Sequence, residues 1–185
     1  MNARGLEPSL APDRASSSAT LAAGSKAIYP GQGPCRIVRV VKKVVGDRVI
    51  MFYNLIILDD SGGELFIPVE KAHAIGVRLL MKKSEIPKLL AHLKKGSKAA
   101  DSWKQRATDN MKLFTSGSPY DLAEIVASLT ELGSTRSLTL GESGTLDRAR
   151  RLLISEISEV MAETKTEAAD QVDRALKLRI DRSKS

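Results

Sequence analysis

The hydrophobic period of the chain changes near Gly76, and this change constrains the fold more than any other feature. Before it, runs rich in Val and Ile are separated by turn residues such as GQGP and DDSGG, which is the pattern of short antiparallel strands. After it, apolar residues recur every three or four positions, as in helices. The sequence therefore predicts an α+β protein of two domains, a small antiparallel sheet bent into a β-barrel followed by an all-α helical bundle.

Four short runs predict the strands, namely KAIYP, CRIVRVVKKVV, RVIMFYNLIIL and GELFIPV. Gly46 and Asp47 separate the second run from the third, which is the length of a tight hairpin turn. Asp59 and Asp60 lack the spacing of a calcium loop and indicate a turn. We therefore expect a hairpin at Gly46 within an antiparallel sheet.

Capping residues predict where the later helices begin and end. The predicted caps are Ser84 and Gly96 for the first helix, a Ser102 and Gln105 capping box for the second, Ser118 with Pro119 and Gly133 for the third, and a Thr139 and Glu142 capping box for the fourth. A final helix is expected near 166–177.

Composition supplies the domain boundaries. Residues 1–23 are rich in Ala, Ser and Pro without a periodic pattern, which predicts a disordered leader. We assign 24–82 to the sheet domain, 83–180 to the helical domain and 181–185 to a disordered tail.

The charge of the chain favours a polyanionic partner. The formal net charge is +7 and the sequence pI is about 9.6, and the excess is +4 over 24–82 and +5 over 83–116, against −2 over 117–185. The sequence contains neither a run of about 18 apolar residues nor the apolar block of a secretory signal. A cytoplasmic protein without a membrane partner is expected.

Neither a catalytic motif nor a metal-ligand pattern is found in the sequence. The single cysteine, Cys35, lies beside Arg36 in a predicted strand, where the role of a small buried hydrophobe is favoured over that of a nucleophile. His73 and His92 are the only histidines, too few for a metal site with this cysteine. We expect neither catalysis, nor a metal, nor a cofactor.

The only tryptophan, Trp103, lies at the start of the helix predicted from Ser102. Its spacing allows two interpretations. One stripe of that helix is formed by Trp103, Ala107, Met111 and Phe114, and this periodicity favours a core-facing tryptophan. A first-turn residue can also project past a bundle, and cations beside a helix N-terminus suit a phosphate backbone.

Lysines and one arginine surround this tryptophan in sequence. Lys104, Arg106 and Lys112 are on the same predicted helix, and Lys98 ends the preceding basic run KKSEIPKLLAHLKKGSK. Such a run is by default a solvated helix face. Next to an apolar wedge it becomes a candidate DNA contact, because some proteins open a base step from the minor groove in this way.

Four segments, in order, resemble the CarD/CdnL family of bacterial transcription regulators. GSKAIYPGQGPCRIV resembles the opening of the family, and IPVEKAHAIGVR resembles the end of its first domain. WKQRATDNMKLFTSGSPYDLAEIVASL and LTLGESGTLDRARRLLISEI resemble its helical half. The resemblance extends from Gly24 to about Met161.

The resemblance implies a Tudor-like β-barrel that binds the β subunit of RNA polymerase by strand-edge contact. It also implies a helical domain that contacts promoter DNA at the upstream edge of the transcription bubble, with the residue matching Trp103 wedged into the minor groove. Arg106 matches a basic family position. The family favours the open complex without reading base sequence, and no helicase motif of the related transcription-repair coupling factor is found in this chain.

The chain also departs from the family pattern. Gln105, Ala107 and Thr108 stand where relatives carry further basic or aromatic residues, and Phe66 stands where a relative may carry arginine. Lys42, Lys43 and Phe66 are the candidates for polymerase contact. The resulting hypothesis is a monomeric, nucleoid-associated regulator that bridges polymerase and DNA, and the alternative is a general basic nucleic-acid-binding protein with no polymerase partner.

Overall fold

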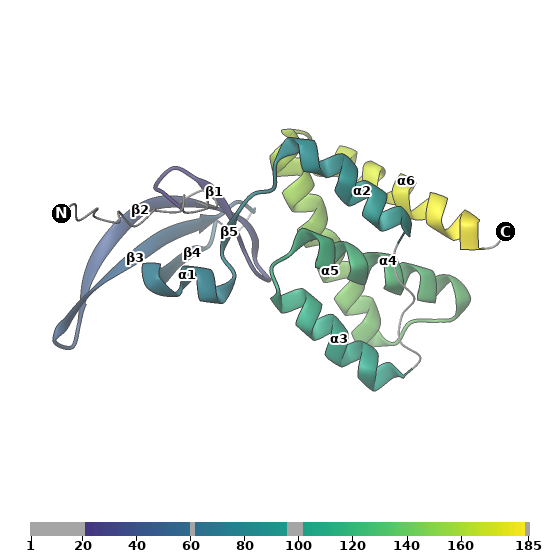
Figure 1. Cartoon of the computed structure of the whole chain (residues 1–185), viewed down its shortest axis with the longest axis horizontal. Helices are drawn as coiled ribbons and strands as arrows, with labels where there is room; N and C mark the ends of the chain where they lie inside the picture. Colours follow the sequence, from purple (N-terminus) through teal and green to yellow (C-terminus); the bar gives the residue numbers. More distant parts are fainter. Residues whose placement is uncertain (1–20, 60–61, 96–101, 184–185) are drawn as a thin grey trace, which may run out of the picture.

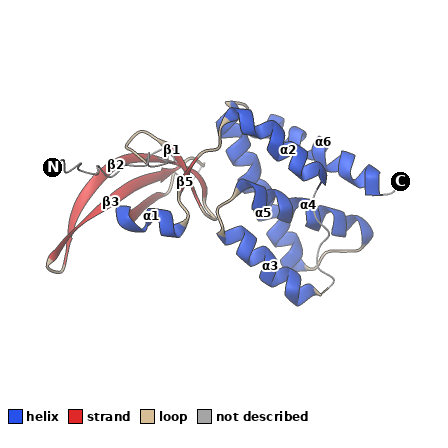
Figure 2. Ribbon diagram, viewed as in Figure 1, coloured by secondary structure: helices blue, strands red, loops and turns tan. Residues whose placement is uncertain are grey.

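The computed structural model describes residues 21–59, 62–95 and 102–183. They form two parts (Figure 1), which we call the sheet half, residues 21–79, and the bundle half, residues 83–183. All five strands and one short helix lie in the sheet half, and the longer helices lie in the bundle half (Figure 2). The sequence therefore predicted correctly the order of the two kinds of structure.

The sheet is antiparallel throughout. Its strands are β1 (Lys26–Tyr29), β2 (Gly33–Val45), β3 (Arg48–Ile57), β4 (Glu64–Pro68) and β5 (Arg78–Leu79), in the order β4-β3-β2-β1-β5. The hairpin is confirmed: Val45 pairs with Arg48, and Gly46 has φ 61°, a left-handed conformation that glycine adopts without strain. The sheet is open with β4 and β5 at its edges, so closure into a barrel is not confirmed.

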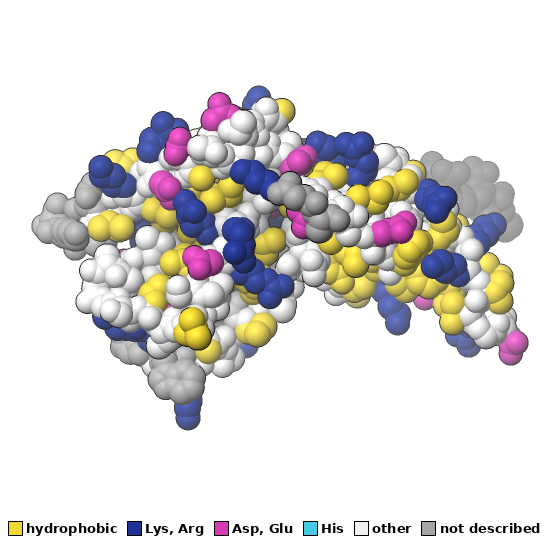
Figure 3. All heavy atoms as spheres, turned by 180° about the vertical axis from the view of Figure 1, so that it is seen from behind, with side chains coloured by type: hydrophobic (Ala, Val, Ile, Leu, Met, Phe, Trp, Pro, Cys, Tyr) yellow, Lys and Arg dark blue, Asp and Glu magenta, His cyan; other side chains and the backbone are white. Residues whose placement is uncertain are grey.

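The sheet half has its own core, covered partly by α1 (Val69–Ile75). Its fully buried side chains include Ala27, Cys35, Ile37 and Leu55. The Leu21 carbonyl accepts a hydrogen bond of 3.0 Å from the Tyr53 hydroxyl, which ties this residue to β3. The hairpin of β2 and β3 continues beyond this core, so valines become exposed toward its tip, where Val44 is 75% accessible. Figure 3 shows hydrophobic side chains gathered on the sheet half, with Lys and Arg between them.

The bundle half begins with a 3₁₀ turn, Lys83–Glu85, followed by α2 (Ile86–Lys95), α3 (Trp103–Thr115), α4 (Pro119–Thr135), α5 (Leu140–Met161) and α6 (Lys165–Ser183). Leucine, isoleucine and valine side chains from α2, α4, α5 and α6 fill its core, including Leu89, Leu93, Ile125, Leu129, Leu153, Ile157 and Val172. Among the described residues, no helix is both long enough and apolar enough to cross a membrane.

Two of the predicted helix starts are confirmed. The Ser118 hydroxyl accepts from the Asp121 N–H with Pro119 at the first helical position, and Thr139 and Glu142 form a reciprocal capping box. The expected end at Gly133 is wrong, because α4 continues to Thr135.

Of the other two predicted starts, one is wrong and one is confirmed without its predicted cap. Ser84 lies inside the 3₁₀ turn, where the Glu85 carboxylate accepts from the Lys82 N–H at 2.7 Å. Helix α3 begins directly after Ser102 as predicted, but the Ser102 side chain makes no cap hydrogen bond, and Gln105 donates to Asp109. The expected stop at Gly96 lies outside the described residues. Helix α6 begins one residue before the expected range and extends to Ser183, beyond the predicted Lys177.

Candidate nucleic-acid interface

Helix α3 lies along the outside of the bundle half, at the bottom of Figure 1, and packs against α4 and α5. Its packed face differs from the predicted stripe. Ala107 is exposed and Met111 is 65% exposed, so the core-facing position that the stripe predicted for them is wrong. The packed side chains are Arg106, Asn110, Leu113 and Phe114, which also follow helical spacing but begin with a charged residue. Phe114 of the predicted stripe does pack on the core, so the apolar pattern was right for that residue and wrong for Ala107 and Met111. It missed Arg106 because apolar periodicity cannot include a buried charged residue.

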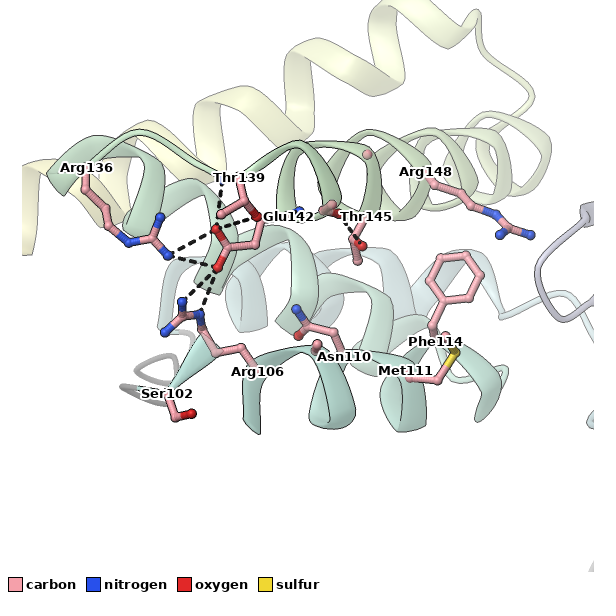
Figure 4. A pocket seen from close by; sticks show the side chains of 13 residues that line it. Ser102, Arg106, Asn110, Met111, Phe114, Arg136, Thr139, Glu142, Thr145 and Arg148 are labelled. Atoms are coloured by element: carbon pink, nitrogen blue, oxygen red, sulfur yellow. Dashed lines mark hydrogen bonds and ion pairs between the residues drawn. The ribbon is translucent and has the colours of Figure 1, made fainter. Parts of the chain in front are cut away.

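The Arg106 side chain is buried, with the residue 7% exposed. Its Nε and Nη2 donate to Glu142 Oε1 at 3.0 and 2.9 Å. Glu142 belongs to the first turn of α5, so this pair connects α3 to α5 (Figure 4). In this arrangement the guanidinium that the sequence assigned to DNA contact faces a carboxylate, and its direct role is in positioning α3.

Glu142 is the centre of this attachment. Arg136, at the end of α4, donates to both of its oxygens at 2.8 and 3.1 Å, and the Thr139 N–H and hydroxyl donate to Oε2 at 3.0 and 3.1 Å. The Arg136 hydrogen bond is the largest cause that lowers the pKa of Glu142 from 4.5 to about 2, with Thr139 and Arg106 adding to it against the opposing effect of burial. One ionised carboxylate therefore joins three helices.

A groove of about 1080 Å³ separates α3 from α5. Figure 4 shows Met111 and Phe114 at one end, and Arg106, Arg136 and Glu142 at the other. The floor on the α5 side is formed by Gly141, Gly144 and Thr145, and side chains added at either glycine would meet nothing within 4 Å. The exposed side of α3 thus presents the apolar Met111 side chain beside an open groove, with Arg106 and Arg136 at the other end of that groove.

The remaining predicted DNA contacts are placed as follows. Lys104 and Lys112 are exposed on α3. Trp103 is the first residue of α3, but its side chain lies outside what the structure describes. Lys98 also lies outside the described residues. The structure therefore places two predicted cations on exposed positions of α3, about two helical turns apart along the helix.

The predicted polymerase contacts are divided between two faces of the hairpin. Lys43 lies with its Nζ 3.7 Å from the Phe66 ring centroid and 5.6 Å from that of Phe52, which is cation–π distance. Lys42 pairs in register with Met51, and neighbouring residues of a strand point to opposite faces. The structure thus brings Lys43 and Phe66 together beside the edge strand β4, and places Lys42 on the other face.

Cys35 is fully buried, and its thiol donates to the Ala27 carbonyl at 3.3 Å. Burial raises the pKa of this thiol to about 11, so it is protonated at neutral pH. The prediction of a packing role for Cys35 is confirmed.

Sequence reasoning identified Glu142 only as a cap and did not identify Arg136 or the face of α3 that Arg106 occupies. The capping pattern of Thr139 and Glu142 was the available signal, since a carboxylate fixed at a helix start is a ready partner for cations. Which arginines reach the Glu142 carboxylate depends on tertiary packing, so no local sequence pattern could identify them.

Two family models match the chain. The model described as CarD-like/TRCF RID domain matches residues 21–80, and the model described as CarD, C-terminal domain matches residues 88–173. The first range covers the sheet half and the second covers most of the bundle half, in the order expected from the sequence motifs. The α3 surface and its groove lie within the second range.

Proposed function

The chain belongs to the CarD/CdnL family of RNA polymerase-interacting transcription regulators, and we propose that it stabilises the open promoter complex by binding polymerase and DNA at once. The sheet half binds the β subunit of RNA polymerase, and the bundle half binds the upstream edge of the promoter bubble. The observation that carries this proposal is the presence of both domain models, in order, on one chain.

The proposed polymerase contact is the edge of the sheet at β4. An edge strand offers unpaired backbone groups to which a strand of another protein can add. Phe66 is on β4, 40% exposed, with Lys43 over its ring. A strand of the β subunit pairs with β4, and these two side chains supply contact area and charge beside it. Lys42, on the opposite face of the hairpin, is a secondary contact.

The proposed DNA contact is the start of α3. Trp103 enters a base step from the minor groove, while Lys104, Lys112 and Lys98 neutralise phosphates around it. No Ser102 side chain caps the helix, which is consistent with an anion binding at this N-terminus. Arg106 acts indirectly, by holding α3 on Glu142. Contacts of this kind do not read base sequence.

The mechanism is a shift of equilibrium. A protein that binds the melted promoter better than the closed one stabilises the open complex by that difference in affinity. A wedge and a few phosphate contacts supply about 1 to 3 kcal/mol, the usual range of coupling energies. Catalysis plays no part in this mechanism, which takes place on the bacterial nucleoid.

The test measures the lifetime of open complexes formed by purified polymerase, with the wild-type chain, Trp103→Ala and the paired variant Lys104→Ala/Lys112→Ala. Wild type should lengthen the lifetime. The lifetime with Trp103→Ala should be about tenfold shorter than with wild type, equivalent to about 1.4 kcal/mol. This variant should retain the fold and the binding to the β subunit. Met111→Ala, on the exposed face of the same helix, is the matched control for loss of apolar area.

Three results would contradict the proposal. If wild type does not change the lifetime, open-complex stabilisation is wrong. If the full chain binds duplex DNA but does not retain the β subunit at low salt, the chain is instead a general nucleic-acid-binding protein. If Trp103→Ala unfolds, the core-facing interpretation of that residue is correct, and the lysine pair variant then decides whether α3 contacts DNA.

A further inference from the structure

One face of α5 is directed toward the sheet half. The residues of α5 that touch it are Arg148, Leu152, Glu156 and Glu159, spaced by four, four and three positions, which places them on one side of a helix. The opposite side of α5 lies in the bundle core with Leu153 and Ile157. We call these four residues the α5 stripe.

The strongest contact on the α5 stripe is made by Arg78 of β5. Its Nη1 and Nη2 each donate to one oxygen of Glu156 at 2.7 Å, and its Nε donates to the Gly117 carbonyl at 2.6 Å. Glu156 is 1% exposed and also accepts from the Met81 N–H at 3.2 Å. Because this guanidinium donates from Nε and from both terminal nitrogens, it fixes the orientation of β5 relative to α5 as well as the distance between them.

Glycines let the two halves approach to backbone contact beside this ion pair. Gly117, with φ 75°, begins the segment leading to α4, and a Cβ there would lie 3.0 Å from the Gly76 carbonyl oxygen and 3.1 Å from the Pro30 ring. A Cβ on Gly33 would lie 3.1 Å from Leu152 Cδ2. The backbone at Gly117 and Gly33 therefore lies so close to the other half that a side chain at either position would not fit without a shift of its neighbours.

Two further contacts lie at the ends of the α5 stripe. Lys26 Nζ is 2.7 Å from Glu159 Oε2, and Arg148 Nη2 donates to the Gly31 carbonyl at 3.1 Å. Arg148 also lies over the Phe114 ring of α3 at 4.7 Å. The sheet half is therefore held along about three turns of α5, and the N-terminal end of that contact reaches α3.

We propose that the α5 stripe is a positioning surface that fixes the angle between the sheet half and α3, with Arg78 and Glu156 as its main positioning residues. The inference rests on the proposed function, because it assigns the two binding ends to one rigid body. With a rigid connection, the entropy cost of ordering the two halves is met when the chain folds and not when it binds. Polymerase bound at β4 therefore holds α3 at a fixed place on the DNA.

The experiment uses the full chain with Arg78→Lys and Glu156→Gln. Arg78→Lys keeps the charge but removes the fork that reaches Gly117 and both Glu156 oxygens. The controls are Arg150→Lys and Asp173→Asn, because Arg150 and Asp173 form a more exposed ion pair between α5 and α6 that does not involve the sheet half.

The first measurement is the distribution of distances between spin labels on the introduced cysteines Asp47→Cys and Lys177→Cys, both at exposed positions of opposite halves. Cys35 is buried and does not compete for the label. The wild-type background and both controls should give one narrow distribution, and both junction variants should give a broad one. A distribution that stays narrow in both junction variants would overturn the proposal.

The second measurement compares binding with function. Retention of the β subunit and affinity for short duplex DNA should each stay within about twofold of wild type in Arg78→Lys, while open-complex lifetime should fall by at least about fivefold. A broad distance distribution with an unchanged lifetime would show that the angle has no role. If Glu156→Gln fails to fold, Arg78→Lys and Lys26→Ala carry the same test.

The two proposals fail in different ways. If the wild-type chain does not lengthen the lifetime of open complexes, the proposed function is wrong, and the label distances still decide whether the α5 stripe holds the two halves rigidly. If wild type acts as proposed and Arg78→Lys acts equally well with a broad distance distribution, only the positioning inference is wrong.

Discussion

Helices α3 and α5 begin with similar sequence patterns, but their N-terminal caps differ in the structure. Thr139 and Glu142 close a reciprocal capping box on α5, whereas Ser102 and Gln105 form none on α3. The α5 box also receives Arg106 from α3 and Arg136 from α4. The comparison teaches that the capped start of one helix can hold a second helix in place although the start of that second helix has no side-chain cap.

Removing the carboxylate of Glu142 should have the largest effect on this arrangement. Glu142→Ala removes the cap of α5 and leaves the buried Arg106 without its carboxylate partner, so the free energy of unfolding should fall by about 4 kcal/mol. Chemical denaturation measures it. Glu167→Ala is the matched control, because Glu167 closes the same kind of box with Thr164, and no arginine among the described residues donates to it. An equal loss in both variants would contradict the role of the arginines.

Acid should weaken the same attachment without any substitution. The pKa of Glu142 is lowered from 4.5 to about 2 in the folded chain, chiefly by Arg136. The stabilisation is therefore present above about pH 4.5 and is lost as the pH falls through about 2, by up to about 3 kcal/mol. Unfolding followed from pH 5 to pH 2 should show this dependence in wild type and less of it in Glu142→Gln. Parallel curves would show that another carboxyl is responsible.

The two cap residues themselves should differ in effect. Thr139→Ala removes a side chain that accepts from the Glu142 N–H at 3.2 Å and should cost about 1 kcal/mol. Ser102→Ala removes no cap bond, so the unfolding free energy should stay within about 0.5 kcal/mol of wild type. Thermal unfolding of the two variants side by side measures the difference, and a loss in Ser102→Ala as large as in Thr139→Ala would show that α3 is capped in solution.

The smallest effect on stability is expected at Met111. Its side chain is 65% exposed, so Met111→Ala should change the free energy of unfolding by less than about 0.5 kcal/mol. Had it faced the core, as its spacing predicted, the loss would be about 2 to 5 kcal/mol. Leu113→Ala, on the packed side of α3, is the matched control and should be the more destabilising of the two.

Local patterns were sufficient for most of the fold. The Gly46 turn, the Ser118 and Pro119 start and the Thr139 and Glu142 box each depend on residues close together in the sequence, and each is confirmed. Failures occurred where the partner is distant. The packed face of α3 is decided by Glu142, 36 residues from Arg106, and apolar periodicity cannot include a buried arginine.

The candidate site shows the same division. The position of Trp103 at a helix start and the exposure of Lys104 and Lys112 follow from the sequence. The groove between α3 and α5 does not, because it forms where Gly141 and Gly144 of one helix face side chains of another. Likewise Lys42 and Lys43 are adjacent in sequence, yet only Lys43 reaches Phe66, since the strand sends the two lysines to opposite faces.

The contact between the two halves also has a consequence for the order of events during synthesis. Lys26 and Glu159 are 133 residues apart, so at about 5 to 20 residues per second roughly 7 to 27 s separate their appearance. All strand pairs of the sheet lie within residues 26–79 and can form during that interval. The α5 stripe then docks onto a finished surface, and a junction of glycine backbone and one arginine fork suits such late closure because no strand has to be inserted.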